Sequence, residues 1–117
     1  MAHLSTHVLD TARGKPAAGV RIDLYAYDGV ARRHLKTVTT NADGRTDEPL
    51  LSGERLPAGV YELAFGAAAY FRAQGESLPD PPFLDEVVIR FGLADSAANY
   101  HVPLLLAPYG YSTYRGS

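Results

Sequence analysis

The chain has 117 residues, a formal net charge of −2 and no cysteine. This length suits one domain with a single hydrophobic core, and we expect that domain to span residues 1–117. A sequence without cysteine excludes disulfides and thiolate chemistry, and interspersed charges without a basic stripe argue against nucleic acid as a partner. Neither an apolar run near the ~20 residues that span a bilayer nor a secretory signal is evident, so we expect no membrane association and a cytoplasmic location.

Alternation of apolar and polar residues predicts a chain built almost entirely of β-strands. The first strand is expected at residues 4–9, where Leu4 and Val8 share one face and His7 lies on the other. A loop rich in glycine, alanine and proline follows at 11–19. Further strands are expected at 20–27, 34–40, 61–65, 87–91 and 100–106, with a turn at 41–44.

One stretch, residues 67–75, breaks this alternation. Its alanines, aromatic residues and arginine are tolerable helix formers, and they predict one short helix that ends at Gly75. Three prolines make residues 77–85 an irregular loop. Seven or so short strands in a chain of this length favour a β-sandwich, because two sheets must bury their apolar faces against each other.

The last predicted strand divides its side chains between two faces. Tyr100, Val102, Leu104 and Leu106 form one face, and His101, Pro103, Leu105 and Ala107 form the other. If the first set is the core, His101 points outward beside apolar side chains, as His7 does on the first strand. Outward imidazoles flanked by apolar groups indicate a subunit interface or a pocket.

The tail at 108–117 is expected to be ordered, because its three tyrosines and Arg115 offer buried area and hydrogen bonds that most chain ends lack. Each of these candidate residues also has an ordinary structural explanation. A lone histidine on a strand is more often structural than catalytic, Arg45 after a glycine is most simply a solvated loop charge, and tail tyrosines are most simply packing residues.

A metal site is not expected from the histidine spacing. His3 and His7 are four residues apart, which on a strand separates them by ~13 Å. Zinc ligands lie about 2 Å from the ion, so both cannot bind the same one. His7 and His101 can meet across strands, but the sequence offers no evident third ligand.

Five segments together carry a family resemblance. They are residues 4–11, 14–17, 43–45, 100–106 and the terminal Tyr114-Arg115-Gly116-Ser117. In this order, and over essentially the whole chain, they resemble the 5-hydroxyisourate hydrolases, the purine-catabolic branch of the transthyretin family. The terminal tetrapeptide is the most specific segment, because hormone-carrying transthyretins lack it. Asn99 departs from the pattern at a position where many relatives carry a histidine.

This resemblance implies a transthyretin-like two-sheet β-sandwich of seven to eight strands with one short α-helix. It implies a homotetramer, built as a dimer of dimers, with the sites at the dimer–dimer interface. The implied reaction is hydrolysis of 5-hydroxyisourate to 2-oxo-4-hydroxy-4-carboxy-5-ureidoimidazoline in urate degradation, with no metal and no organic cofactor.

The resemblance places the catalytic positions at His7, Arg45 and His101, and the residues that line the site at Tyr114, Arg115, Gly116 and Ser117. Imidazole exchanges protons near neutral pH, and the two arginines suit a planar, electron-rich substrate. Either histidine can be the base that activates water, and Ser117 can contribute its hydroxyl or the terminal carboxylate. The alternative hypothesis is a transthyretin-like carrier of a small ligand that performs no catalysis.

Overall fold

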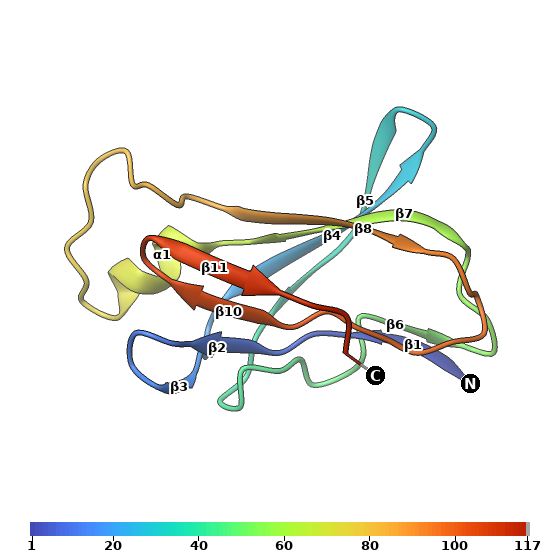
Figure 1. The fold of residues 1–117 in the computed structure, drawn as a ribbon, viewed down its shortest axis with the longest axis horizontal. Helices are drawn as coiled ribbons and strands as arrows, with labels where there is room; N and C mark the ends of the chain where they lie inside the picture. The colour runs from blue at the N-terminus through green and yellow to red at the C-terminus, as the bar shows by residue number, and fades with distance from the viewer. Residues whose placement is uncertain (117) are drawn as a thin grey trace.

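A computed structural model describes residues 1–116 and shows two layers of β-strands with a short helix at one end (Figure 1). The first layer is an antiparallel sheet in the order β5-β4-β7-β8. Its strands are β4 (Arg21–Asp28), β5 (Ala31–Thr39), β7 (Gly59–Phe65) and β8 (Val87–Leu93). The predicted strand at 34–40 therefore begins three residues earlier and ends one residue earlier than expected.

The second layer consists of two smaller sheets, with the orders β6-β1-β9 and β11-β10-β2-β3. The chain passes from the first sheet to the second twice, from β1 to β2 and from β9 to β10. The first holds β1 (Ala2–Ser5), β6 (Leu51–Gly53) and β9 (Tyr100–His101). The second holds β2 (Val8–Asp10), β3 (Lys15–Pro16), β10 (Leu104–Ala107) and β11 (Gly110–Thr113). The prediction missed β3, β6 and β11, whose short sequences carry no clear alternation.

Two predicted strands are each broken in the middle, and the two breaks lie side by side. The expected strand at 4–9 is β1 followed by β2, and the expected strand at 100–106 is β9 followed by β10. Pro103 has no amide hydrogen to give to a ladder, and the Thr6 hydroxyl donates to the Val102 carbonyl at 2.7 Å. Because β1 pairs in parallel with β9, and β2 with β10, the breaks form one seam across the sheet.

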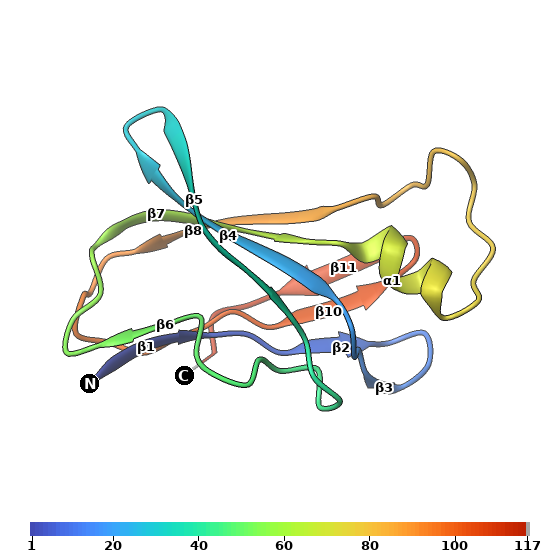
Figure 2. The same ribbon diagram turned by 180° about the vertical axis from the view of Figure 1, so that it is seen from behind.

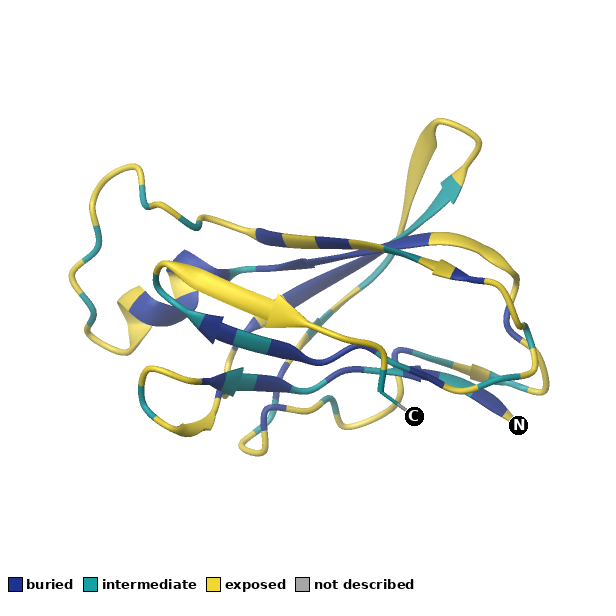
Figure 3. Ribbon diagram, in the orientation of Figure 1, coloured by how far each residue is buried: buried dark blue, intermediate teal, exposed yellow. Residues whose placement is uncertain are grey.

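The core lies between the layers, and its members alternate as predicted along β1, β2, β8 and β10 (Figure 3). In β4 and β7 the alternation fails, because Asp23, Glu62 and Ala64 on the opposite face are buried as well. The largest fully buried side chains include Leu4, Val8, Leu104 and Leu106 from one layer and Ile22, Leu24, Leu63 and Phe65 from the other. Each such side chain contributes roughly 1.5–3 kcal/mol through burial. Pro103 was expected on the outward face but is buried, because the break at 102–103 interrupts the alternation.

Helix α1 (Ala67–Ala73) confirms the predicted helix and packs at the end of the sandwich (Figure 2). Gly75 ends it as predicted, with φ +89°. The Gly75 amide donates to Arg72 and the Glu76 amide to Phe71, both at 3.0 Å, which is the Schellman arrangement. The Tyr70 hydroxyl donates to Asp10 at 2.8 Å and so connects the helix to β2. Burial is the largest cause, and the hydrogen bond to Asp10 the second, of the rise in the pKa of Tyr70 to about 12.

The tail is ordered, but its tyrosines do not pack as expected. Tyr109, Tyr111 and Tyr114 are 64%, 47% and 60% exposed. Tyr111 lies on β11, an exposed edge strand (Figure 3), and the other two lie just outside it. The interpretation of these tyrosines as packing residues is therefore wrong for the single chain. Within residues 1–116, no helix has the length and apolar character needed to cross a lipid bilayer.

Candidate active site

The seam between the broken strands holds both histidines singled out in the sequence. His101 is the last residue of β9 and lies opposite Ser5 in the parallel pairing of β1 with β9. His7 lies in the break between β1 and β2. Both are half-buried, while their neighbours Thr6, Val8, Tyr100 and Val102 are buried. This burial pattern confirms the predicted outward orientation of the two imidazoles.

His7 is held by the turn that follows β5. Its Nε2 lies 2.8 Å from the Asp43 carbonyl oxygen, and a carbonyl only accepts hydrogen bonds, so Nε2 carries the proton. The neutral ring therefore presents a lone pair at Nδ1. Within residues 1–116, no hydrogen bond is seen for Nδ1.

The turn at 41–45 is shaped by Asn41 and Gly44. The Asn41 side-chain oxygen accepts the amide of Asp43 at 2.9 Å and that of Arg45 at 3.2 Å. Gly44 is buried with φ +73°, and a Cβ there would lie 2.3 Å from the Val8 carbonyl oxygen. The Gly44 carbonyl accepts the Val8 amide at 2.8 Å, which anchors the turn to β2. Arg45 is thereby placed next to the seam with its side chain exposed.

His101 is held from two sides. Its Nδ1 lies 2.8 Å from the Ser5 hydroxyl oxygen, and its carbonyl accepts the Gly116 amide at 2.7 Å. Gly116 packs so tightly on the ring that a Cβ would lie 2.7 Å from His101 Cδ2. Partial burial, followed by the charges of Arg45, His7 and His3, lowers the pKa of His101 below its usual value near 6.5. The neutral ring therefore prevails at neutral pH.

The tail reaches this site only in part. Gly116 contacts His101, whereas the Arg115 guanidinium lies 4.2 Å above the Tyr100 ring and donates to the Asn99 carbonyl at 3.3 Å. Tyr114 and Arg115 instead line a neighbouring pocket of about 250 Å³ beside β8. Ser117 lies outside the described residues.

The structure thus gathers His7, His101, Arg45 and Gly116 around one seam, with His3 close enough for its charge to affect His101. Sequence reasoning missed Ser5 and the Asp43 carbonyl. Ser5 is two residues before His7 and shares its strand face, which was a usable signal. The Asp43 contact depends on how a distant turn packs against β2, and the sequence carries no signal for that.

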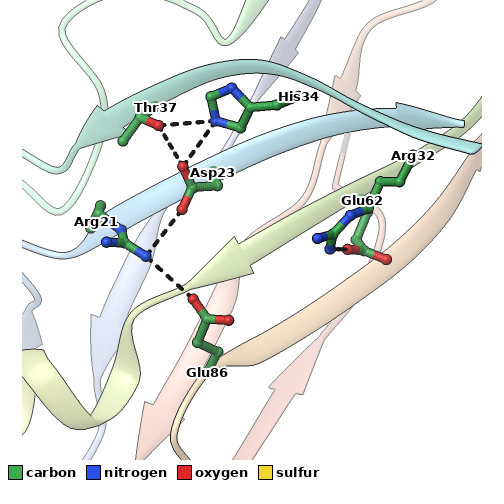
Figure 4. A network of polar contacts seen from close by, with 7 residues as sticks. All are labelled: Arg21, Asp23, Arg32, His34, Thr37, Glu62 and Glu86. Carbon is green, nitrogen blue, oxygen red and sulfur yellow. Dashed lines mark hydrogen bonds and ion pairs between the residues drawn. The ribbon is translucent and has the colours of Figure 1, made fainter.

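The fourth histidine, His34, lies away from this seam on the outer face of the other layer (Figure 4). Its Nε2 lies 3.1 Å from the Asp23 carboxylate, which also receives the Thr37 hydroxyl. That hydroxyl is the main cause of a lowered Asp23 pKa, opposed by burial and aided by His34 and Arg21. Arg32 and Glu62 form a second pair at 2.7 Å. These charges pair with one another on the other layer.

The residues that the structure describes contain no group of three or more histidine, cysteine, aspartate or glutamate side chains placed to hold a metal ion. What the seam offers instead is an imidazole with a free lone pair, a second imidazole held neutral, and an exposed guanidinium beside them. This combination can move a proton and stabilise a developing negative charge.

Comparison with known proteins gives these residues a context. A family model described as "HIUase/Transthyretin family" matches residues 4–116. A protein of Mesorhizobium japonicum named 5-hydroxyisourate hydrolase is 67% identical over 114 residues, covering 97% of this chain and 91% of that protein. The solved structure of Klebsiella pneumoniae 5-hydroxyisourate hydrolase has a TM-score of 0.82 and 36% identity, covering all of both chains. Sea bream transthyretin in complex with thyroxine has a TM-score of 0.85 and 28% identity, covering 97% of this chain and 93% of that chain.

Proposed function

This chain belongs to the HIUase/transthyretin family, and from that premise we propose that it is an enzyme that hydrolyses 5-hydroxyisourate to 2-oxo-4-hydroxy-4-carboxy-5-ureidoimidazoline in urate degradation. The observation that carries this function is the 67% identity, over nearly the full length, to a protein that bears the name of this hydrolase. A transthyretin seen with thyroxine is only 28% identical, so a hormone-type carrier is the weaker alternative.

We assign the base to His7, because its Nε2–H is committed to the Asp43 carbonyl and its Nδ1 has no hydrogen-bond partner within residues 1–116. Nδ1 takes a proton from water as the water oxygen bonds to a ring carbonyl carbon of the substrate. The bond between that carbon and a ring nitrogen then breaks, and the nitrogen receives the proton back from His7. The carbonyl carbon becomes that of a carboxylic acid, which releases its remaining proton to water and leaves a carboxylate. A base placed in this way contributes about 10²–10⁴-fold.

Arg45 and His101 act on the substrate rather than on the water. The Arg45 guanidinium offsets the negative charge that develops on the carbonyl oxygen and binds the planar ring through paired hydrogen bonds. His101, held neutral, meets the substrate through Nε2. The tail residues Tyr114, Arg115, Gly116 and Ser117 complete the binding site, and of these Gly116 already contacts His101.

We further propose a homotetramer, a dimer of dimers, with the sites at the dimer–dimer interface. Support comes from the outward face around the seam, where Leu9, Leu105 and Ala107 remain only half-buried in the single chain. Covering such apolar side chains is a common reason for association. In this proposal residues 1–117 act as one domain, in the cytoplasm, with neither nucleic acid nor membrane as a partner and without a metal or organic cofactor.

One assay tests the function directly. Urate and urate oxidase generate 5-hydroxyisourate in the cuvette, and the added protein is expected to speed its ultraviolet decay beyond the spontaneous rate. The same protein should not bind thyroxine in a dialysis experiment. Decay that stays at the spontaneous rate with micromolar protein overturns the hydrolase, and thyroxine binding without such acceleration supports the carrier.

A further inference from the structure

We propose that Ser5 is a positioning residue for His101: its hydroxyl lets the ring carry its proton on either nitrogen, so that Nε2 can face the substrate as a donor or as an acceptor. The inference rests on the proposed hydrolase for its catalytic meaning. It concerns a residue outside the set of His7, Arg45, His101 and the tail.

The contact between Ser5 and His101 is built into the sheet. The two residues are partners in the parallel pairing of β1 with β9, and the Val102 amide donates to the Ser5 carbonyl at 2.9 Å. This backbone register brings the Ser5 hydroxyl oxygen to 2.8 Å from His101 Nδ1. Gly116 then closes on the other side of the ring, so the imidazole has little freedom to turn away.

The Ser5 hydroxyl is the group in this contact that can change its role. A hydroxyl donates one hydrogen bond and also accepts, so it pairs with Nδ1 whether or not Nδ1 carries a proton. Within residues 1–116, His101 is the one partner seen for this hydroxyl. The neighbouring Thr6 hydroxyl is committed to the Val102 carbonyl and cannot substitute for it.

The two histidines of the seam therefore differ in kind. The Asp43 carbonyl fixes His7 in one tautomer, which suits a dedicated base. The Ser5 hydroxyl leaves both tautomers of His101 satisfied. During ring opening, a substrate carbonyl becomes a carboxylate and a ring nitrogen gains a hydrogen. Because Nε2 of His101 can offer either an N–H or a lone pair, it keeps a hydrogen bond to the substrate throughout the ring opening.

Other charged and titratable groups surround this pair and must be held constant in a test. Arg45 on the turn, His7 in the break between β1 and β2, and His3 on β1 act on the ring through their charges. Arg115 lies on the tail beside Tyr100. None of them contacts Nδ1, so removing the Ser5 hydroxyl alters that nitrogen alone.

The test compares Ser5→Ala and Ser5→Thr in the full chain, with Ser77→Ala as a control, because Ser77 is exposed on the loop at 77–85. Side-chain ¹⁵N NMR of the resting protein reports the His101 tautomer without requiring activity. With alanine, Nδ1 loses its partner, and an orphaned buried N–H is avoided more strongly than an orphaned acceptor. We expect the proton to settle on Nε2 in Ser5→Ala and the wild-type ¹⁵N shifts to persist in Ser5→Thr.

In the decay assay, Ser5→Ala should lower kcat with KM nearly unchanged. We expect a loss of about 10- to 100-fold, by analogy with the range found for hydrogen bonds that orient metal-ligating histidines. Ser5→Thr should recover most of the rate, and Ser77→Ala should match the wild type. Unchanged His101 ¹⁵N shifts in folded Ser5→Ala overturn the proposal, even if kcat falls. If the shifts change as expected but the wild type does not hydrolyse 5-hydroxyisourate, the pairing stands and the hydrolase is wrong.

Discussion

At the scale of single residues, the site depends on how each imidazole is partnered. His7 meets a backbone carbonyl and His101 meets a hydroxyl, so two chemically identical side chains acquire different properties. Among the side chains of residues 1–116, neither is paired with a carboxylate, unlike His34 with Asp23 on the other layer. A carboxylate would favour the protonated ring, and the neutral Ser5 hydroxyl beside His101 provides no such charge.

Replacing His101 with asparagine separates catalysis from structure. The asparagine amide lies where Nδ1 was, so it can keep the hydrogen bond to Ser5 while Nε2 is lost. We expect kcat/KM to fall by about 10²–10⁴-fold, with an unchanged mass in sedimentation and an unchanged melting temperature. His34→Asn is the matched control and should retain full activity. A His101→Asn variant that unfolds or dissociates would show that this histidine is structural.

The lowered pKa of His101 gives a pH prediction. Burial disfavours the charged ring first, and the charges of Arg45, His7 and His3 add to this. The folded protein thus binds this proton less well than the unfolded chain, so His101 contributes stability above pH ~6.5 that is lost as pH falls through the folded pKa. An NMR titration should place the His101 midpoint below 6.5.

Removing one of those charges should move the midpoint in a known direction. Arg45→Gln is expected to raise the His101 pKa towards its usual value, because the second-largest cause of the shift is gone. Arg33→Gln, an exposed arginine on β5, is the control and should leave the titration unchanged. Equal midpoints in Arg45→Gln and the wild type would mean that the guanidinium does not act on His101.

At the scale of elements, the turn at 41–45 matters most, because it delivers both the Asp43 carbonyl and Arg45 to the seam. Its geometry requires glycine at one point, since Gly44 combines a left-handed backbone with a very close approach to β2. Gly14 has a similar φ of +67°, but a Cβ there would meet nothing within 4 Å. A substitution at Gly14 would therefore introduce backbone strain alone, whereas one at Gly44 would add a steric clash.

Alanine at each of these glycines gives a prediction for stability and activity together. Gly14→Ala should cost about 1–2 kcal/mol of unfolding free energy, the left-handed penalty alone, and should keep full activity. Gly44→Ala should cost more and also lower kcat/KM, because the turn must move away from Val8 and take Arg45 with it. Chemical denaturation and the decay assay measure both effects, and equal losses for the two variants would contradict the argument.

The elements also show what the sequence can and cannot predict. Period-two alternation correctly placed His7 and His101 on outward faces, and Gly75 correctly ended the helix. Alternation continues without interruption through Thr6 and Val102, so it gave no sign of the breaks that form the seam. Pro103 is a local cause of the break after β9, but the contact of the Thr6 hydroxyl with the Val102 carbonyl is non-local. For the same reason the pairing of Ser5 with His101, 96 residues apart, was not predicted.

At the scale of the whole molecule, the single chain leaves edges and apolar surface unsatisfied. Strands β8 and β11 are sheet edges, and three tail tyrosines are about half exposed or more. The outward face near the histidines carries Leu9 and Leu105, which face each other in the pairing of β2 with β10. A tetramer that covers this face would enclose the seam and exclude bulk water from it.

Assembly and activity are therefore expected to fail together when the outward face becomes charged. Leu105 is only half-buried and points away from the core, so Leu105→Glu should leave the fold of the single chain intact. Two copies of the new carboxylate meeting across an apolar interface would each lose water without gaining a partner, and that cost opposes association. Sedimentation equilibrium should show a smaller assembly, and the decay assay should show a loss of at least tenfold.

Val30→Glu provides the control, because Val30 is fully exposed at the tip of the β4–β5 hairpin, far from this face (Figure 1). It should keep both the wild-type mass and the wild-type rate. A Leu105→Glu variant that stays assembled would place the interface elsewhere. If it dissociates but hydrolyses 5-hydroxyisourate at the full rate, the seam of a single chain is sufficient for catalysis, and the sites do not depend on the junction between dimers.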